Sequence, residues 1–359
     1  MNTHHVSRIA CACIAASLFA CGGGHDDGRD HMPPSNSAYA ATSLVSDTTT
    51  LPAAHTDANL VNAWGVAFNP RGFVWVADNG TAKSTLYDGN GVPQSLVVDT
   101  PAGPTGIVFN GTQDFKLSQN GVTAPSPFLF ASESGSISAW SPTVSPTTAV
   151  VVFDGSAGGS VYKGLAISTY GGANYLYAAD FHNGRVDVFD ASFARVALPG
   201  AFSDPGLPAG YAPFGIQAIG ERIYVAYAKR EASGDDEQAG AGLGIIDVYD
   251  TGGKLIKQLV SGGALNAPWG MALAPANFGS ASNMLLVGNF GDGRINTYDP
   301  STGAAGGPLL KADRTPLSVD GLWGIAFGNG LNSQPMNTLF FAAGPNDEAH
   351  GQYGRIDLQ

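Results

Sequence analysis

A short phrase centred on glycine recurs six times along the chain and constrains its fold more than any other feature. Asn62-Ala63-Trp64-Gly65-Val66-Ala67-Phe68 is one copy, and Leu322-Trp323-Gly324-Ile325-Ala326-Phe327 is another. The central glycines follow one another at intervals of 41 to 58 residues: Gly65, Gly106, Gly164, Gly215, Gly270 and Gly324. Repeats of this length with strand-like content indicate an array of similar units.

Each repeat has the same internal order of strand-like segments. The glycine phrase is followed by an apolar run, as at 73–78 and 175–180. A segment with alternating apolar and polar residues comes next, as at 184–190, and a more polar one ends the unit, as at 149–154. Alternation at period two is typical of half-buried strands. Four antiparallel strands per repeat, six times over, predict an all-β, six-bladed β-propeller.

The two ends of the chain are predicted to meet in the last blade. The sequence ends soon after the third strand of the sixth repeat, at 354–358, so that blade lacks a fourth strand. Residues 42–47 have strand character and precede the first repeat. An N-terminal strand in this position completes the last blade, closes the ring and covers an exposed edge. We therefore expect residues 41–359 to form a single propeller.

The N-terminus predicts export. Arg8 precedes an apolar run from Ile9 to Ala20 that is too short to span a membrane. The run ends in Leu18-Phe19-Ala20-Cys21, which resembles a bacterial lipobox. We expect residues 1–21 to be a signal peptide with Cys21 as the lipidation site, or alternatively an ordinary secretory signal cleaved nearby. Residues 22–40 are rich in Gly, Asp, Pro and Ser and predict a flexible tether. The protein is then a periplasmic or outer-membrane lipoprotein, or is secreted.

Composition excludes some classes of partner and site. The net charge is −12, which argues against a nucleic-acid partner, since phosphate binding needs a basic surface. All three cysteines lie at positions 11, 13 and 21, so the propeller has no disulfide, catalytic cysteine or cysteine-ligated metal. We expect a monomer whose only membrane contact is the N-terminal lipid.

Several segments resemble a known group of proteins. The phrases that carry the likeness span 62–78, 161–166, 175–190 and 323–327. They are similar to NHL-type propellers, and residues 42–359 most resemble an uncharacterised bacterial family of exported, NHL-like six-bladed propellers. The wider group includes lactonases, strictosidine-synthase-like enzymes, amidating lyases and binding modules. The resemblance therefore implies the fold and leaves the activity open.

The loops at one mouth of such a propeller hold the candidate catalytic residues. His182 and Asp180 lie together in Asp180-Phe181-His182-Asn183-Gly184, and Lys163 enters the same blade. A histidine beside a carboxylate is suited to general-base catalysis or metal binding. The alternative is a solvent-facing histidine, because Asn183-Gly184 suits a type I′ hairpin turn.

Polar residues at matching blade positions form a candidate metal set. Asp78, Glu133, Asp180 and Asn289 each end a second strand and supply the oxygen ligands that Ca²⁺ prefers. The resemblance implies a similar channel site, since lactonase-like relatives hold a divalent ion through acidic and Asn ligands. Alternatively, these side chains cap the backbone of turns.

The tryptophans beside the glycines offer a candidate ligand platform. Trp64, Trp269 and Trp323 could stack on a sugar or an apolar ligand, or could instead fill the space between blades. A charged insert at 229–237 interrupts the fourth repeat. It is interpreted as a solvated loop, with a lid or a partner contact as alternatives.

Two functions remain open. The first is a binding module at the cell surface or in the periplasm for a small molecule, a glycan or a protein. The second is a hydrolase, lactonase or lyase assisted by Ca²⁺ or another divalent cation. The sequence leaves open whether the protein is an enzyme.

Overall fold

Strands make up almost all of the regular structure. The computed structural model describes residues 37–232 and 234–359, which belong to one unit, Asn36–Gln359. In this part of the chain there is no α-helix, and the only helical turns are 3-10 turns at Asn79–Thr81, Ser156–Gly158 and Gly279–Ala281. None of them is long or apolar enough to span a membrane. The all-β prediction is confirmed, whereas the predicted signal peptide and Cys21 lie outside the described residues.

The strands follow the order that the repeat predicts. The glycine phrases form the first strands: β3 (Ala63–Phe68), β7 (Pro104–Phe109), β13 (Tyr162–Tyr170), β17 (Tyr211–Ile219), β21 (Pro268–Leu273) and β25 (Leu322–Phe327). The second strands are β4 (Val74–Asp78), β10 (Phe128–Ser132), β14 (Ala173–Asp180), β18 (Arg222–Lys229), β22 (Leu285–Asn289) and β26 (Leu339–Ala343). The third strands are β5 (Lys83–Tyr87), β11 (Ser136–Ser141), β15 (Arg185–Phe189), β19 (Gly244–Asp250), β23 (Ile295–Tyr298) and β27 (Gln352–Leu358).

The fourth strands vary most in length. They are β6 (Val98–Asp99), β12 (Ser145–Asp154), β16 (Arg195–Val196), β20 (Leu255–Ser261), β24 (Ala305–Pro308) and, from the N-terminal end, β1 (Tyr39–Ser46). Strands β13–β16, β17–β20 and β21–β24 form separate four-stranded antiparallel sheets. The runs β3–β6 and β7–β10–β11–β12 are joined into one eight-stranded sheet by a single parallel pair, Asp99 with Thr148.

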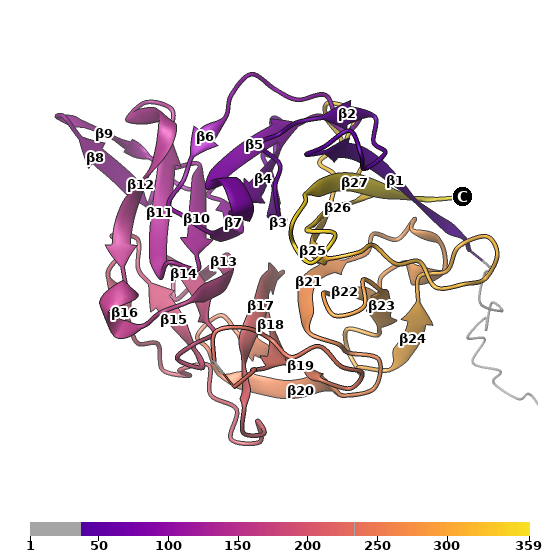
Figure 1. Cartoon of the computed structure of the whole chain (residues 1–359). Helices are drawn as coiled ribbons and strands as arrows, with labels where there is room; N and C mark the ends of the chain where they lie inside the picture. The colour runs from indigo at the N-terminus through magenta and orange to yellow at the C-terminus, as the bar shows by residue number, and fades with distance from the viewer. Residues whose placement is uncertain (1–36, 233) are drawn as a thin grey trace, which may run out of the picture. The chain divides into compact units, whose positions relative to one another are not determined.

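The first strands pack against one another in a closed ring. Each contacts the next, and β25 contacts β3 (Figure 1). The glycines make this approach possible. A Cβ on Gly215 would lie 2.1 Å from the backbone oxygen of Trp269, and one on Gly324 would lie 2.4 Å from that of Trp64. The recurring glycine is therefore required because neighbouring backbones approach where a side chain has no room.

The N-terminal strand pairs with the C-terminal one. β1 runs antiparallel to β27, with Tyr39 opposite Leu358 and Ser46 opposite Gln352. It begins at Tyr39, earlier than the predicted start at 42 and inside the segment assigned to the tether. The reason is the buried Tyr39 ring, whose hydroxyl donates to the carbonyl oxygen of Phe278 at 2.8 Å.

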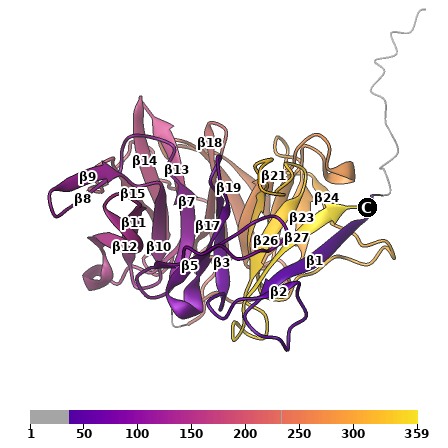
Figure 2. The ribbon, with the colours of Figure 1, turned by 90° about the horizontal axis from the view of Figure 1, so that it is seen from above.

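Three short strands lie outside the four-strand pattern: β2 (His55–Thr56), β8 (Lys116–Gln119) and β9 (Val122–Pro125). β2 pairs in parallel with the end of β1. A hairpin of β8 and β9 lies between β7 and β10 in the sequence and projects from one side in Figure 2.

The hydrophobic core is divided among the interfaces between sheets. For example, Tyr177 of β14 and Val188 of β15 share a cluster with Val225 of β18.

Buried acids on the third strands are neutralised in different ways. Asp187 on β15 forms ion pairs with Arg185 at 2.7 Å and with Arg195 at 3.2 Å. Asp247 lies at the equivalent position of β19, but no Lys or Arg of the described residues pairs with it. Its neighbours are the Tyr249 hydroxyl, which donates at 3.1 Å, and the carboxyl group of Asp204. Burial, together with the charge of Asp204, raises the pKa of Asp247 to about 7.

This difference predicts a dependence of stability on pH. Between about pH 4 and 7 the native protein holds a proton on Asp247 that the unfolded chain has released, so stability falls as pH rises through this range. Asp247→Asn removes that slope and stabilises the protein at pH 8 by on the order of 2–4 kcal/mol. Chemical denaturation of both proteins at pH 5 and pH 8 measures the effect. If the free energies of unfolding of the two proteins differed by the same amount at pH 5 and pH 8, the prediction would be wrong.

Candidate functional site

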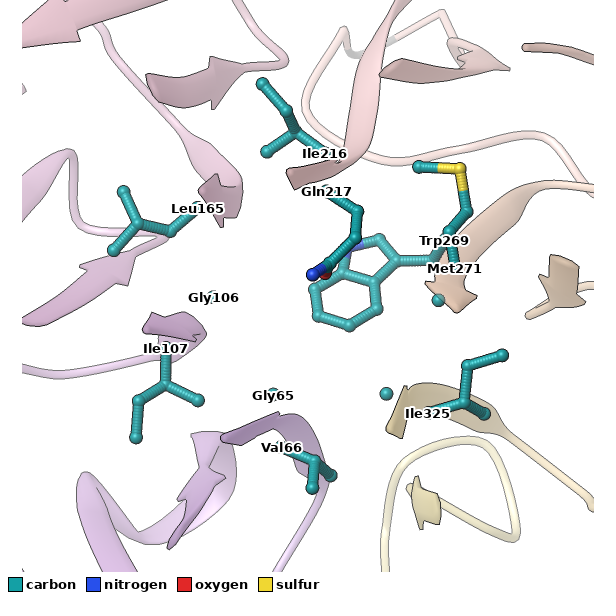
Figure 3. Close-up of a pocket in the computed structure, with 12 residues that line it drawn as sticks. Gly65, Val66, Gly106, Ile107, Leu165, Ile216, Gln217, Trp269, Met271 and Ile325 are labelled. Carbon is teal, nitrogen blue, oxygen red and sulfur yellow. The ribbon is translucent and has the colours of Figure 1, made fainter. Parts of the chain in front are cut away.

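The centre of the ring is a narrow channel lined mainly by backbone. Residues from all six first strands surround a cavity of about 30 Å³ (Figure 3). The aliphatic side chains that follow the glycines, such as Val66, Ile107 and Leu165, point away from the centre, while Gln217 and Trp269 reach into it. Such a volume holds roughly one or two water molecules. A sugar-sized ligand therefore has no room inside the channel, and a site for one must lie at an end of it.

Aromatic rings cluster near the ends at which the first strands begin. Trp64 and Trp323 stack with their centroids 3.5 Å apart, and the Trp269 ring meets both edge-on. Phe290 stacks on Trp323 at 4.1 Å. All three tryptophans of the predicted platform are buried in this cluster. A ligand that stacks on them has to displace part of the packing.

A buried lysine lies directly on this aromatic layer. Lys163 is 2% exposed, and its Nζ is 5.2 Å from the centre of the Trp64 ring. The ammonium donates to Glu133 Oε1 at 2.6 Å and to Asp236 Oδ1 at 3.2 Å. Burial alone would lower the pKa of Lys163, but the charges of Glu133, Glu237 and Asp236 outweigh it and raise the pKa. Lys163 is therefore a permanent cation held among carboxylates.

Two further carboxylates belong to the same cluster. Glu348 Oε1 accepts a hydrogen bond from the Trp323 indole nitrogen at 3.2 Å. Burial raises the pKa of Glu348, and the charge of Glu133 adds to the effect. Burial also raises the pKa of Glu237 to about 7, although Lys163 opposes it. We call Glu133, Asp236, Glu237 and Glu348, arranged around Lys163, the acidic mouth.

The three predicted catalytic residues are separated by their own partners. The Asp180 carboxylate accepts from the Val161 and Asn183 amides and pairs with Arg185 at 3.2 Å. His182 pairs through Nδ1 with Asp235 of the charged insert at 2.5 Å, and its side chain is 43% exposed. Lys163 binds Glu133 and Asp236. In the described residues no hydrogen bond or ion pair links any two of the predicted three.

The predicted metal set is likewise distributed among local partners. Asp78 accepts from the Thr85 hydroxyl, and burial raises its pKa well above the usual range. Asn289 binds the Asn266 amide, the Ala264 carbonyl and Asp292. Glu133 binds Lys163 and Asn79. Within residues 37–232 and 234–359, no three His, Cys, Asp or Glu residues form a group that could hold a metal ion. Calcium binding through Asp78, Glu133, Asp180 and Asn289 stays a prediction.

Sequence reasoning did not find three members of the acidic mouth. Asp236 and Glu237 lie in the charged insert, and Glu348 lies in an irregular loop after β26. In the sequence, these three residues are marked only by lying in segments that depart from the repeat. Asn62, which begins the first glycine phrase, also contributes: its Nδ2 donates to Asn79 Oδ1 at 3.3 Å, while its buried Oδ1 has no partner.

Comparison by sequence identifies relatives in a virus. Two of these relatives are the proteins R648 and L690 of Acanthamoeba polyphaga mimivirus, each described as uncharacterized. R648 is 35% identical over 326 residues, covering 87% of this chain and 78% of the relative. L690 is 34% identical over 330 residues, covering 87% and 84%. No family model matches the chain. The relatives found are thus viral, whereas the resemblance in the sequence pointed to a bacterial family.

Comparison by structure identifies β-propeller proteins of several activities. An aldose sugar dehydrogenase from Streptomyces coelicolor superposes with a TM-score of 0.53 at 13% identity, covering 91% of this chain and all of that one. A gluconolactonase from Xanthomonas campestris gives 0.52 at 12% identity, covering 84% and 87%. A virginiamycin B lyase from Staphylococcus aureus gives 0.51 at 13% identity, covering 90% and 100%. At these identities the likeness shows a propeller fold and leaves the activity open.

Proposed function

We propose that this chain, which belongs to the family of the mimivirus proteins R648 and L690, is a six-bladed propeller that binds a ligand at its acidic mouth. The closed ring of β3, β7, β13, β17, β21 and β25 supports the number of blades, since each of these strands begins a four-strand run. In this assignment β1 completes the blade of β25–β27, as its pairing with β27 supports.

The surplus of carboxylates at one end of the channel is the observation that carries the binding role. Glu133, Asp236, Glu237 and Glu348 surround a single ammonium, so the cluster has more negative charge than Lys163 neutralises. Glu133 is 32% exposed and Asp236 is 66% exposed, so a ligand can reach the cluster from solvent. A surplus of carboxylates in one cluster costs stability through mutual repulsion, and carboxylates with shifted pKa values are more typical of a functional site than of a structural one.

Export and the nature of the partner are part of the proposal and rest on the sequence. The lipobox-like Cys21 and the tether would place the mouth in the periplasm or on the cell surface of a bacterium, or the protein is secreted. The partner there is a small molecule, a glycan or a protein, and the protein itself is a monomer. The net charge of −12 supports a partner other than a nucleic acid.

Screening by thermal denaturation tests the binding role. We expect some small molecule or glycan to stabilise the wild-type protein, by about 2.7 kcal/mol at a hundred times its dissociation constant. The same compound should lose its effect on Glu133→Gln and on Glu348→Gln. Glu221→Gln is the matched control, because Glu221 lies at the opposite end of the β17–β18 hairpin from Lys229. Compounds that stabilise all four proteins equally would count against a site at the mouth.

A second candidate function is catalysis by His182 as a hydrolase, lactonase or lyase. The pairing of His182 with Asp235 favours it, because a carboxylate orients an accessible imidazole for proton transfer. A divalent cation such as Ca²⁺ would be its cofactor. Turnover of lactone substrates that His182→Gln abolishes, without a change in melting temperature, would favour this function over binding alone.

A further inference from the structure

We infer that the ligand of the acidic mouth carries an alkylammonium group. This inference rests on the proposed function and adds the chemical class of the ligand. The charge of the cluster favours a cation. Burial is the main cause of the raised pKa values of Glu348 and Glu237. Repulsion adds to it, from Glu133 at Glu348 and from Glu348 and Asp236 at Glu237. A cation bound between these carboxylates would relieve the repulsion, and an anion would increase it.

The position of Lys163 shows which kind of cation the cluster accommodates. Its ammonium is held by two carboxylates and lies over the Trp64 ring, 5.2 Å from the ring centre. Carboxylates beside the face of an indole ring bind ammonium groups well, through hydrogen bonds and cation–π attraction. The mouth therefore already holds one alkylammonium group, supplied by its own chain.

A second, independent observation is an unused acceptor in the same cluster. Asn62 is 7% exposed, and its Oδ1 has no hydrogen-bond partner. The other end of its amide is tied through Asn79 to Glu133, because Asn79 Nδ2 donates to Glu133 Oε2 at 2.8 Å. The side chain of Asn62 also lies within hydrogen-bonding reach of Glu348. A buried amide oxygen without a donor is costly. This oxygen packs against Gly344, at the start of the loop that carries Glu348, so an N–H of a bound ammonium would satisfy it once that loop shifts.

A metal ion fits the same surroundings less well. Ca²⁺ needs six to eight oxygen ligands, whereas the described residues contain no group of three His, Cys, Asp or Glu side chains suited to a metal. An alkylammonium needs only a few acceptors and an apolar surface beside its carbon chain.

Isothermal titration with 1,4-diaminobutane tests the inference. We expect saturable binding at pH 7 to wild-type protein, with release of protons as the pKa of Glu237 falls. Glu348→Gln and Glu237→Gln should each weaken binding about tenfold, whereas Glu221→Gln at the same ionic strength should change it less than about twofold. 1,4-Butanediol serves as the uncharged isostere, and CaCl₂ as the metal probe. Circular dichroism melts confirm that each variant is folded.

The outcomes separate this inference from the proposed function. Absence of diaminobutane binding, equal binding of butanediol, or equal weakening by Glu221→Gln would each overturn the inference. Tighter binding of Ca²⁺ with the same dependence on Glu348 would also overturn it, in favour of a metal site. In these cases an uncharged or metal ligand that depends on Glu133 and Glu348 would leave the proposed function intact. The proposed function fails only if no ligand of any class depends on them.

Discussion

Gly215→Ala is expected to destabilise the protein by more than about 3 kcal/mol, and to prevent folding if the native margin is small. The added methyl group would lie 2.1 Å from the backbone oxygen of Trp269 and 2.8 Å from its carbonyl carbon. These atoms belong to the neighbouring strand of the ring, so relief requires two strands to separate. Urea denaturation, or the soluble yield where the variant does not fold, measures the loss.

Two other glycines calibrate this prediction. Gly158 is a glycine with no atom within 4 Å of an added Cβ, and Gly158→Ala is expected to change stability by less than about 1 kcal/mol. The loss of stability in Gly164→Ala should fall between these two, because a Cβ added at Gly164 would lie 2.9 Å from the backbone oxygen of Phe214. Equal stability of Gly215→Ala and Gly158→Ala would show that the strands of the ring do not approach as described.

Val45→Asp is expected to have the second large effect, a loss of several kcal/mol. Val45 is fully buried on β1 and lies opposite Tyr353 of β27, so the variant places a carboxylate without a partner in the interface that joins the two ends of the chain. Ala41→Asp is the matched control, because Ala41 lies on the same strand but is exposed. Thermal unfolding of the two variants should differ sharply. Similar melting temperatures would mean that β1 does not stabilise the ring.

The sequence predicted the fold well because the fold depends on a repeated steric requirement. Each glycine phrase marks a strand that has to approach its neighbour closely, and the alternation that follows marks strands with one buried face. The start of β1 was less predictable. Tyr39 follows a polar segment rich in Pro, Ser and Asn, and its burial against Phe278 depends on a contact with a residue far away in sequence.

The candidate site was predictable only in part. Lys163 and Glu133 were singled out by their positions in the repeat, Lys163 as a catalytic residue and Glu133 as a metal ligand. Their contact with each other, and with Asp236 and Glu348, could not be predicted, because Asp236 and Glu348 lie in irregular segments that no repeat places in space. Asp180 and His182 are neighbours in sequence, yet their side chains have different partners, Arg185 and Asp235.

A crystal structure with 1,4-diaminobutane tests most directly whether the mouth of the ring binds an ammonium-bearing ligand. We expect one nitrogen of the diamine to lie within hydrogen-bonding distance of Asn62 Oδ1 and of a carboxylate oxygen of Glu348 or Glu133. The pair of Lys163 with Glu133 should remain in place. Electron density for the diamine elsewhere on the surface, with the acidic mouth unchanged, would contradict the claim.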